Sequence, residues 1–505
     1  MASQVVPLQS QEIEYLQTEM NQSSMSREIV PKSGHSSHQK RGTVQLFNEK
    51  DEQVNSIVDL TIIMIGIMSG SFTFGYAITY LTLSFDTVFD HIELKGTINE
   101  EQGLFSAILP IGCIVGAVSS HFLMQVLTRN QTLIIADICG MLSILSLVPI
   151  REMILAFRFM YGVCNGISCI VMPIYIKELC PQKYYERFSV MAGFLIGIGV
   201  LTAYIMALGY LNPDLRGPNT YWWQLMFALP PVVFFFRQLI VTVIYQMDSP
   251  ISLLEKGLQL QAKNVVERLY TKSSVEQAFL KAQLRVQYNE EHKEGLIKIF
   301  SKKHCTTVSI GCVLMFIYTW CGIFAVFSYS SQFFASMGNN DLTLNTIFSL
   351  VLGISQQLPA YVSKFFYSKW GKRSLLIFGL IFIICCQIIV IGLSYTENEA
   401  AVIIRFVVLC LFAFVYALTI SPICWSMTPE INSSEGTYFC IISVFVWQLF
   451  MLYVFPFMLE GMSMTGSFIL FTILTFLCLI FSYFFVKETK GLNHREIDIL
   501  YGKGE

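Results

Sequence analysis

Charged side chains are scarce in this sequence, and neither sign of charge dominates. Only 13% of the 505 residues are charged and the formal net charge is −2, whereas soluble proteins carry roughly 25% charged residues. A protein that binds nucleic acid needs a basic surface, which this balance excludes. Hydrophobic residues make up 54% of the chain. We therefore expect most of the chain to avoid water, and we expect no nucleic-acid partner.

The sequence also lacks the spacing patterns of enzymes, metal sites and disulfide-rich domains. Its 14 cysteines show no Cys-x-x-Cys or Cys/His ligand spacing. They lie in apolar runs or in loops that we place in the cytoplasm, where disulfides are rare. We find no nucleophile–base set and no phosphate-binding loop. We therefore predict no enzyme activity, no metal and no cofactor.

The first residues show no targeting signal. Residues 1–56 are polar and rich in Ser and Gln, without the apolar core of a signal peptide or a Met-Gly start for myristoylation. Segments of low hydrophobicity stay disordered because they bury too little apolar surface to offset the entropy of ordering. We predict a disordered cytoplasmic tail over 1–56.

Long apolar runs, in contrast, recur along the chain. A bilayer core requires about 20 apolar residues in a helix, and lipid offers the backbone no other hydrogen-bond partner. Twelve stretches meet this requirement, which predicts an all-α membrane protein with twelve transmembrane helices. The stretches are 57–80, 103–126, 131–150, 153–176, 188–210, 222–245, 307–335, 342–366, 374–394, 400–426, 437–459 and 464–486.

A polar, helix-prone segment divides these spans into six and six. Apolar residues recur in it at helical spacing, which favours short amphipathic helices under the membrane domain. We predict a six-helix bundle over 57–246, a cytoplasmic helical linker over 247–306, a second six-helix bundle over 307–487 and a cytoplasmic tail over 488–505.

Basic residues cluster in one set of alternating loops. The opposite set contains only Lys95, Arg151 and Arg216, among many acids. The positive-inside rule therefore places both termini and the linker in the cytoplasm. The pattern fits the plasma membrane and an internal membrane equally.

The two halves echo each other at the ends of their fourth spans. An intramembrane proline, Pro173 or Pro422, precedes an acid at the cytoplasmic surface, Glu178 or Glu430. Related halves with a site between them at mid-membrane are a recurrent transporter design. The repeat favours a transporter, although proline packing within a helix is the alternative interpretation.

Short motifs follow one another in a fixed order along residues 74–491. They are Phe74-Gly75-Tyr76, the stretch from Arg158 to Gly162, Met247-Asp248-Ser249-Pro250, Gly322 with Phe327 to Ser330, Gly371-Lys372-Arg373, and Glu488-Thr489-Lys490-Gly491. Together they resemble the sugar-porter branch of the major facilitator superfamily. The resemblance implies two six-helix bundles that rock about a central site and expose it to one side at a time.

The resemblance also implies a cytoplasmic latch of acid–base pairs. Such pairs contribute roughly a few tenths to one kcal/mol each, and several together bias a two-state equilibrium. Ordinary topology charge is the alternative interpretation. The resemblance assigns the latch to Glu178, Arg187, Lys372, Arg373, Glu430 and Asp248. It assigns structural roles within the membrane to Arg158, Gly322, Pro173 and Pro422.

Several positions depart from the family pattern. Gln125 to Asn130 replace the charged motif that the family has after span two, so we expect a weakened latch in the first half. By spacing from Gly322, the family's Gln-Gln pair and Asn fall on Tyr318, Thr319 and Phe324. The absence of these amide side chains at the three positions argues against a standard hexose site, because each sugar hydroxyl that leaves water needs a hydrogen-bond partner in the protein.

Three further residues complete the expected substrate site. Trp425 matches the family's span-ten Trp, Gln356 falls on the family's span-eight Asn, and Gln448 on span eleven is placed in the same cavity. Packing between helices is the alternative for each. The predicted substrate-binding residues are thus Trp425, Gln356, Tyr318, Thr319, Phe324 and Gln448.

These observations predict a monomeric facilitator for a small polar organic solute, first a sugar or polyol. Ala77 stands where proton-linked porters commonly have an Asp, and we find no other convincing buried carboxylate. Arg237 and Arg405 are expected to snorkel toward the membrane surface, and binding of an anionic substrate is the alternative for Arg237. A transporter of an organic ion or other metabolite, and a non-transporting nutrient sensor, remain alternatives.

Overall fold

The computed structural model describes residues 53–215, 220–291, 301–329, 342–360, 369–396, 398–492 and 494–502, together with residues 362 and 366. Within these residues the regular elements are helices, and β-type pairing is limited to an isolated bridge between Val54 and Tyr270. The predicted tail lies outside the described residues as far as residue 52. The first described helix begins at Ile57, and the side chain of its N-cap residue Ser56 accepts a hydrogen bond from the Asp59 N–H.

The N-terminal bundle consists of six long helices with short helical turns at their ends. Two of the long helices begin with a capping box, built by Thr97 with Glu100 and by Thr128 with Gln131, which satisfies free N–H groups at the helix start. The elements are α2 (Ile57–Thr79), η3 (Thr82–Ser84), α3 (Phe85–Phe89), α4 (Ile98–Val126), α5 (Arg129–Leu142), η4 (Ser143–Leu147), α6 (Arg151–Leu179), α7 (Gln182–Ala207), η5 (Leu208–Leu211), η6 (Pro213–Leu215), α8 (Trp222–Gln238) and the π-helical η7 (Leu239–Ile244).

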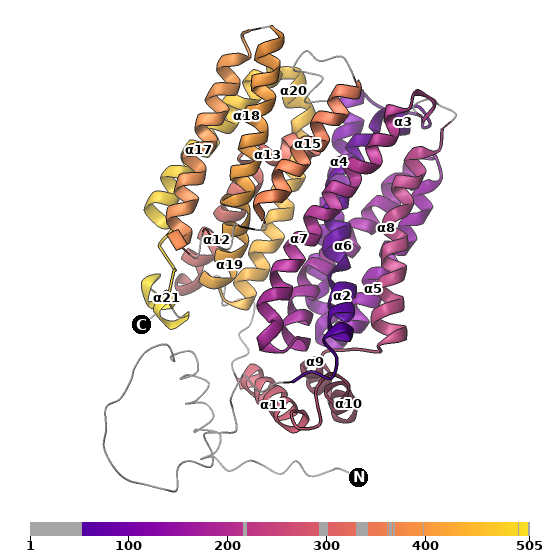
Figure 1. The fold of residues 1–505 in the computed structure, drawn as a ribbon, viewed down its shortest axis with the longest axis vertical. Helices are drawn as coiled ribbons and strands as arrows, with labels where there is room; N and C mark the ends of the chain where they lie inside the picture. Colours follow the sequence, from indigo (N-terminus) through magenta and orange to yellow (C-terminus); the bar gives the residue numbers. More distant parts are fainter. Residues whose placement is uncertain are drawn as a thin grey trace.

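Three short helices fall within the predicted linker range. They lie below one end of the bundles, on the side where the described chain begins (Figure 1). We call this end the linker side and the opposite end, where α3 lies, the far side. The linker helices are α9 (Pro250–Glu255), α10 (Gln259–Leu269) and α11 (Val275–Glu291).

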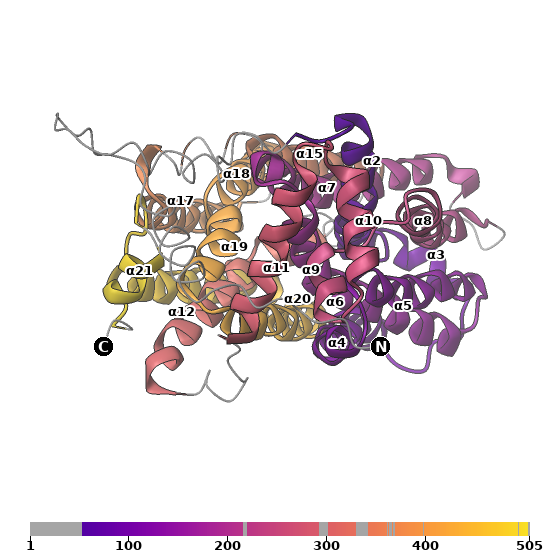
Figure 2. The same ribbon diagram turned by 90° about the horizontal axis from the view of Figure 1, so that it is seen from below.

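The C-terminal bundle stands beside the first one (Figures 1 and 2). Its seventh-span helix is broken at Gly322, whose φ of 98° is a conformation that glycine adopts without a Cβ penalty. The elements are α12 (Lys302–Trp320), α13 (Ile323–Ser328), α15 (Leu342–Ala360), α17 (Lys372–Leu393), α18 (Glu399–Leu418), α19 (Ile420–Ile431), α20 (Ser434–Phe485) and α21 (His494–Leu500).

The helices account for the twelve predicted spans. Among the described residues, nine helical stretches are long and apolar enough to cross a membrane. One of these, α20, has 52 residues and a non-helical break at Ser463, so it contains both the eleventh and the twelfth predicted span. The helices α12 and α15 lie where the seventh and eighth spans are predicted. Pro173 lies inside α6, and Pro422 lies in the first turn of α19, where its missing N–H costs little.

Small residues allow α4 and α6 to approach closely. A Cβ added to Gly112 would lie 2.9 Å from the Gly162 Cα, and one added to Gly166 would lie 2.8 Å from the backbone of Cys113. Membrane helices associate through such close backbone packing because lipid provides little hydrophobic drive between them. The glycines on these two helices therefore hold the first bundle together beside the central axis.

A buried ion pair crosses the core of the first bundle, so the prediction that Arg237 snorkels is wrong. The Arg237 Nε donates to Asp137 Oδ2 at 2.9 Å, its Nη2 is ion-paired with the second carboxylate oxygen, and Nη2 also donates to Ser168 Oγ at 3.1 Å. Both side chains are buried, with exposures of 1% and 0%. Asp137 is thus a buried carboxylate that the sequence reasoning missed.

The reason for the error is that α5 supplies a countercharge at the same depth as Arg237. A charged side chain within a span either reaches the interface or finds a partner inside the bundle. Gln238, the next residue of α8, also donates to Asp137. Arg405 is likewise buried, at 6% exposure, and its Nε donates to the Ala401 carbonyl at 3.3 Å.

Replacement of one member of the Asp137–Arg237 pair should be far more harmful than replacement of both. Asp137→Leu or Arg237→Met alone leaves an uncompensated buried charge, which costs about 3–5 kcal/mol. The double variant removes both charges and should recover most of that loss, because buried pairs are often replaceable by apolar residues. Thermal unfolding of the four purified proteins in detergent measures this. Equal losses in the single and double variants would contradict it.

Candidate functional site

A small cavity of about 10 Å³, room for roughly one water molecule, lies between the two bundles and is lined by both. The first bundle contributes side chains from α2, α4 and α6, and the second contributes side chains from α13 and α20. Apolar walls include Phe74, Phe324 and Leu452, and the polar lining includes Arg158 and Gln448. A cavity at the junction of two rigid bundles changes shape when they move relative to each other, so it is the candidate solute site.

Arg158 is held in place by groups of its own bundle. Its Nε donates to the Phe105 carbonyl at 2.9 Å and its Nη1 to the Tyr80 hydroxyl at 2.7 Å. The guanidinium carbon also lies 5.1 Å from the centre of the Tyr80 ring. These contacts fix a positive charge at the cavity wall and leave the guanidinium with a defined orientation.

Gln448 presents an unmet hydrogen-bonding group at the cavity. The side chain is buried, at 4% exposure, and its Nε2 has no hydrogen-bond partner among the described residues. Buried amides are normally hydrogen-bonded, and an unmet one costs about 1–3 kcal/mol. A ligand that offers a hydroxyl or carbonyl oxygen would therefore be favoured at this position.

Two of the predicted site residues contact each other on the second bundle. The rings of Tyr318 on α12 and Trp425 on α19 meet edge to face, with centres 5.8 Å apart and planes at 86°. The Tyr416 hydroxyl donates to the Tyr318 carbonyl at 2.8 Å, which anchors α12 to α18. This geometry positions the aromatic pair, and its contact with a solute remains a prediction.

Of the four remaining predicted site residues, the fold brings two together at the cavity and places the other two elsewhere. Phe324 and Gln448 line the same cavity. Gln356 on α15 is half-buried, and its Oε1 has no hydrogen-bond partner among the residues described. Thr319 is fully buried, and its hydroxyl donates to the Met315 carbonyl of its own helix at 3.1 Å. The substrate-binding roles of all four stay predictions.

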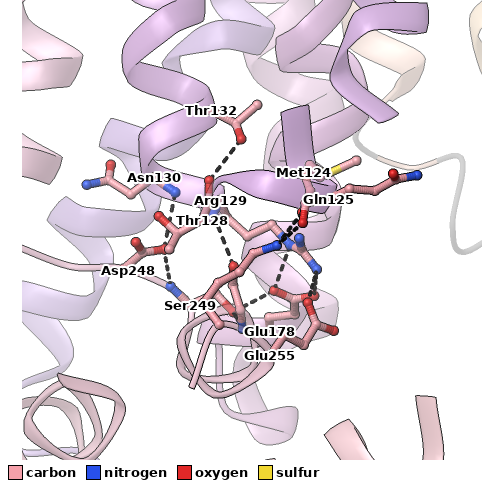
Figure 3. A network of polar contacts seen from close by, with 12 residues as sticks. Met124, Gln125, Thr128, Arg129, Asn130, Thr132, Glu178, Asp248, Ser249 and Glu255 are labelled. Atoms are coloured by element: carbon pink, nitrogen blue, oxygen red, sulfur yellow. Dashed lines mark hydrogen bonds and ion pairs between the residues drawn. The ribbon is translucent and has the colours of Figure 1, made fainter. Parts of the chain in front are cut away.

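A polar network ties the first bundle to the linker on the linker side (Figure 3). Arg129 at the start of α5 binds Glu178 with both Nε (3.2 Å) and Nη2 (3.1 Å), and Nη2 also contacts Glu255 of α9 at 3.2 Å. Bidentate pairs of this kind are stronger than single contacts. Although Gln125 to Asn130 replace the family's charged motif, Arg129 within this segment still pairs with Glu178.

Asp248 closes the other side of this network (Figure 3). Its Oδ1 accepts the backbone N–H of Asn130 at 3.1 Å and that of Ser249 at 2.7 Å. The first of these N–H groups belongs to the start of α5, where a negative charge is favourable. Burial raises the pKa of Asp248, while its hydrogen bonds and Arg129 partly oppose that shift.

The second bundle repeats this arrangement with different residues. Glu488 accepts the backbone N–H of Lys372 at 2.9 Å and that of Arg373 at 3.0 Å, at the start of α17. Lys372 is ion-paired with Glu430, and the Thr489 hydroxyl donates to Glu430 at 3.1 Å. In each bundle, an acid that follows the sixth span thus caps the helix that forms the third span: Asp248 caps α5 and Glu488 caps α17.

The predicted latch residues therefore contact members of their own bundle. Glu178, Asp248, Lys372 and Glu430 all do so in the contacts above, and Arg373 Nη2 donates to the Tyr483 carbonyl of the same bundle at 2.8 Å. The side chain of Arg187 lies outside the described residues. Whether these residues act as a latch stays a prediction.

Comparison with known proteins gives a family and a fold. The family model described as "Sugar (and other) transporter" matches residues 58–501. Among curated proteins, "Hexose transporter 1" of Plasmodium knowlesi is 24% identical over 444 residues, which cover 83% of this chain and 88% of that protein. "Glucose transporter GlcP" of Staphylococcus epidermidis is 27% identical over 406 residues, covering 79% of this chain and 88% of that one.

Among solved structures, the xylose transporter XylE from E. coli, in a partially occluded inward-open conformation, matches with a TM-score of 0.73. It is 20% identical to this chain, and the match covers 86% of this chain and 100% of XylE. At this level of identity the likeness concerns the fold.

The stability of the Asp248 cap should depend on pH in a defined direction. Because burial raises the pKa of this carboxyl above its ordinary 3.8, the folded protein binds the proton more tightly than the unfolded chain. The stabilisation is full below pH 3.8 and is lost as pH rises through the raised pKa. The melting temperature of wild type relative to Asp248→Asn, which keeps an acceptor oxygen, should therefore fall from about pH 4 upward.

Asp248→Ala provides the matched control, because it removes the acceptor altogether. It should cost about 0.5–2 kcal/mol at neutral pH, as loss of a helix cap does, and more than Asp248→Asn. A difference between wild type and Asp248→Asn that is constant from pH 4 to pH 8 would contradict the pH assignment.

Proposed function

Because the chain belongs to the sugar (and other) transporter family, we propose that it carries a sugar or polyol across a membrane by alternating access, as a facilitator. The predicted all-α major facilitator fold is confirmed by the family match and by the likeness to XylE, and the chain is a transporter rather than an enzyme. The observation that carries the proposal is the family match over residues 58–501. A small cavity lined by both bundles supports it, and this cavity must widen as the bundles move before it can admit a sugar.

The chemistry of the cavity suits a small polyhydroxylated solute. Gln448 offers an unpaired amide, and Arg158 supplies a fixed hydrogen-bonding cation at the wall. Phe74 and Phe324 add apolar faces of the kind that pack against the C–H surfaces of sugars. The relatives described as hexose and glucose transporters favour a hexose among the candidate solutes.

The charge distribution supports uniport over proton coupling. Ala77 is fully buried and lines the cavity at the position where the resemblance predicts a carboxylate in a proton-linked porter. Asp137, the buried carboxylate of α5, is instead committed to Arg237. Asp137 is not among the residues that line the cavity. Protonation of its carboxyl is therefore not linked to solute binding by a direct contact among the described residues.

Orientation and assembly are part of the same proposal. The linker side, with both chain ends, faces the cytoplasm, because the basic residues of the loops lie there. The latch residues hold the linker-side end of each bundle in a fixed shape, so that the two ends meet in the same geometry each time that side closes. The protein acts as a monomer in the plasma membrane or an internal membrane, and it has no nucleic-acid partner.

Uptake into vesicles that contain only the purified protein tests the transport mode. Labelled hexose, pentose, polyol and organic-ion solutes are offered with and without an imposed proton gradient. We expect saturable uptake of a hexose or polyol that stops at the external concentration and is unaffected by the gradient. Accumulation that collapses with the gradient would show a symporter, and uptake of the organic ion alone would move the substrate to another class.

Substitution of Gln448 tests the site independently of the transport mode. Gln448→Leu removes the amide that meets a solute hydroxyl, and the loss of about 1–3 kcal/mol should raise the KM for uptake about 5- to 150-fold. Gln261→Leu on the exposed face of α10 is the matched control and should leave KM unchanged. An unchanged KM for Gln448→Leu, in protein that melts like wild type, would remove Gln448 from the site.

A further inference from the structure

Alternating access requires contacts between the bundles that hold one side closed and then release it. The ion pairs described above each join elements of a single bundle, or of the first bundle and its linker. They therefore do not themselves connect the moving parts. Side chains that donate hydrogen bonds from one bundle to the other are better candidates for closing contacts, and Asn99, Tyr204 and Tyr438 do so among the described residues.

Two of these contacts lie toward the far side. The Asn99 Nδ2 on the first turn of α4 donates to Glu460 Oε2 on α20 at 2.6 Å. The Tyr204 hydroxyl near the far-side end of α7 donates to the Phe327 carbonyl of α13 at 3.2 Å. In the same region, a Cβ added to Gly103 would lie 2.9 Å from the Tyr453 carbonyl, which shows how closely α4 and α20 pack there.

The third contact lies toward the linker side. The Tyr438 hydroxyl on α20 donates to the Ala117 carbonyl of α4 at 2.8 Å, with the Val118 carbonyl at 3.3 Å. Tyr438 is in the second turn of α20, roughly 6 Å along the axis from Ser434 at the helical rise of 1.5 Å per residue. Its ring also lies 5.5 Å from the ring of His121, the next turn of α4 toward the linker side.

We infer that Tyr438 is a closing contact between the bundles on the linker side. It is a positioning residue that holds α20 against α4 while that side is shut, and the hydroxyl leaves the α4 carbonyls when that side opens. This inference rests on the proposed alternating-access function and adds a gate residue to it. It differs from the charged latch because the contact is neutral and joins the two bundles directly.

The chemistry of this contact suits repeated breaking. When the hydroxyl leaves, the α4 carbonyls keep their helical hydrogen bonds, because a carbonyl oxygen has two lone pairs and its helix occupies only one. An ion pair across the same gap would leave two unpaired charges near the membrane each time it opened, which is costly. The gate thus opens with little penalty, while the ion pairs within each bundle stay intact.

Hydrogen exchange on the purified protein tests the contact without any solute. Tyr438→Phe keeps the ring and removes the hydroxyl, so opening of the linker side should increase by about two- to tenfold, the range expected for one hydrogen bond. Faster exchange is expected in peptides covering 117–126 and 434–443, and not in 98–106 or 455–462. Tyr453→Phe, on the far-side half of the same helix and 45% exposed, is the matched control and should change neither region.

Transport in the two directions gives a second readout. A carrier shifted toward its open linker side should have a higher KM for solute entering from the far side and a lower KM for solute entering from the linker side. A purely structural role of Tyr438 would lower Vmax in both directions without this opposite movement of KM. Asn99→Ala should move the two KM values in the reverse sense.

The outcomes separate the gate from the proposed substrate. Unchanged exchange at both linker-side segments in Tyr438→Phe overturns the inference, even if sugar transport is found. Increased exchange there with no uptake of any sugar or polyol supports the gate and refutes the proposed substrate. If Tyr438→Phe unfolds, Tyr438→Trp, which keeps a ring but moves its donor, should still give faster exchange at 117–126 than at 98–106, and equal exchange would overturn the inference.

Discussion

Lipid supplies no hydrogen-bond partner, and most features of this protein follow from that constraint. The backbone must satisfy itself in helices, and each charged side chain placed within a span must find its countercharge inside the bundle. Arg237 and Asp137 meet this demand together, supported by Ser168 and Gln238. The pair and Ser168 join α5, α6 and α8, so the same contacts that neutralise the charge also link three helices of the first bundle.

The same constraint distinguishes the contacts that hold each bundle together from those that hold the bundles to each other. Strong, charge-assisted contacts such as Arg129 with Glu178 lie within one bundle and its linker. Tyr438, in contrast, joins the bundles on the linker side through a neutral hydroxyl that donates to a backbone carbonyl. Rigid halves with a weak, chargeless connection are what a rocking transporter needs, since the strong contacts persist while the weak one breaks.

The two halves use one capping device despite their weak sequence likeness. Asp248 caps the start of α5, and Glu488 caps the start of α17, each following the last span of its own bundle. The sequence places both acids in motifs of the family but does not reveal what they bind, because the partners are backbone N–H groups about 120 residues earlier. Arg129 is a similar case: the motif around it is altered, yet the one remaining base reaches Glu178.

The membrane class, the positions of the apolar spans and the family could all be predicted from the sequence, because apolar run length and motif order are local properties of the chain. The sequence also marked Gly322 as special, and the positive φ there explains why. Which polar residues meet depends on how the helices pack: the fold pairs Asp137 with Arg237, sets Gln448 and Phe324 on one cavity, and brings Tyr438 to α4. Asp137 could have been recognised from the sequence, because an ionisable residue in an apolar span is a known signal of a buried polar contact. Its pairing with Arg237 could not, because the rotation and depth of the packed helices bring such residues together and no single segment encodes them.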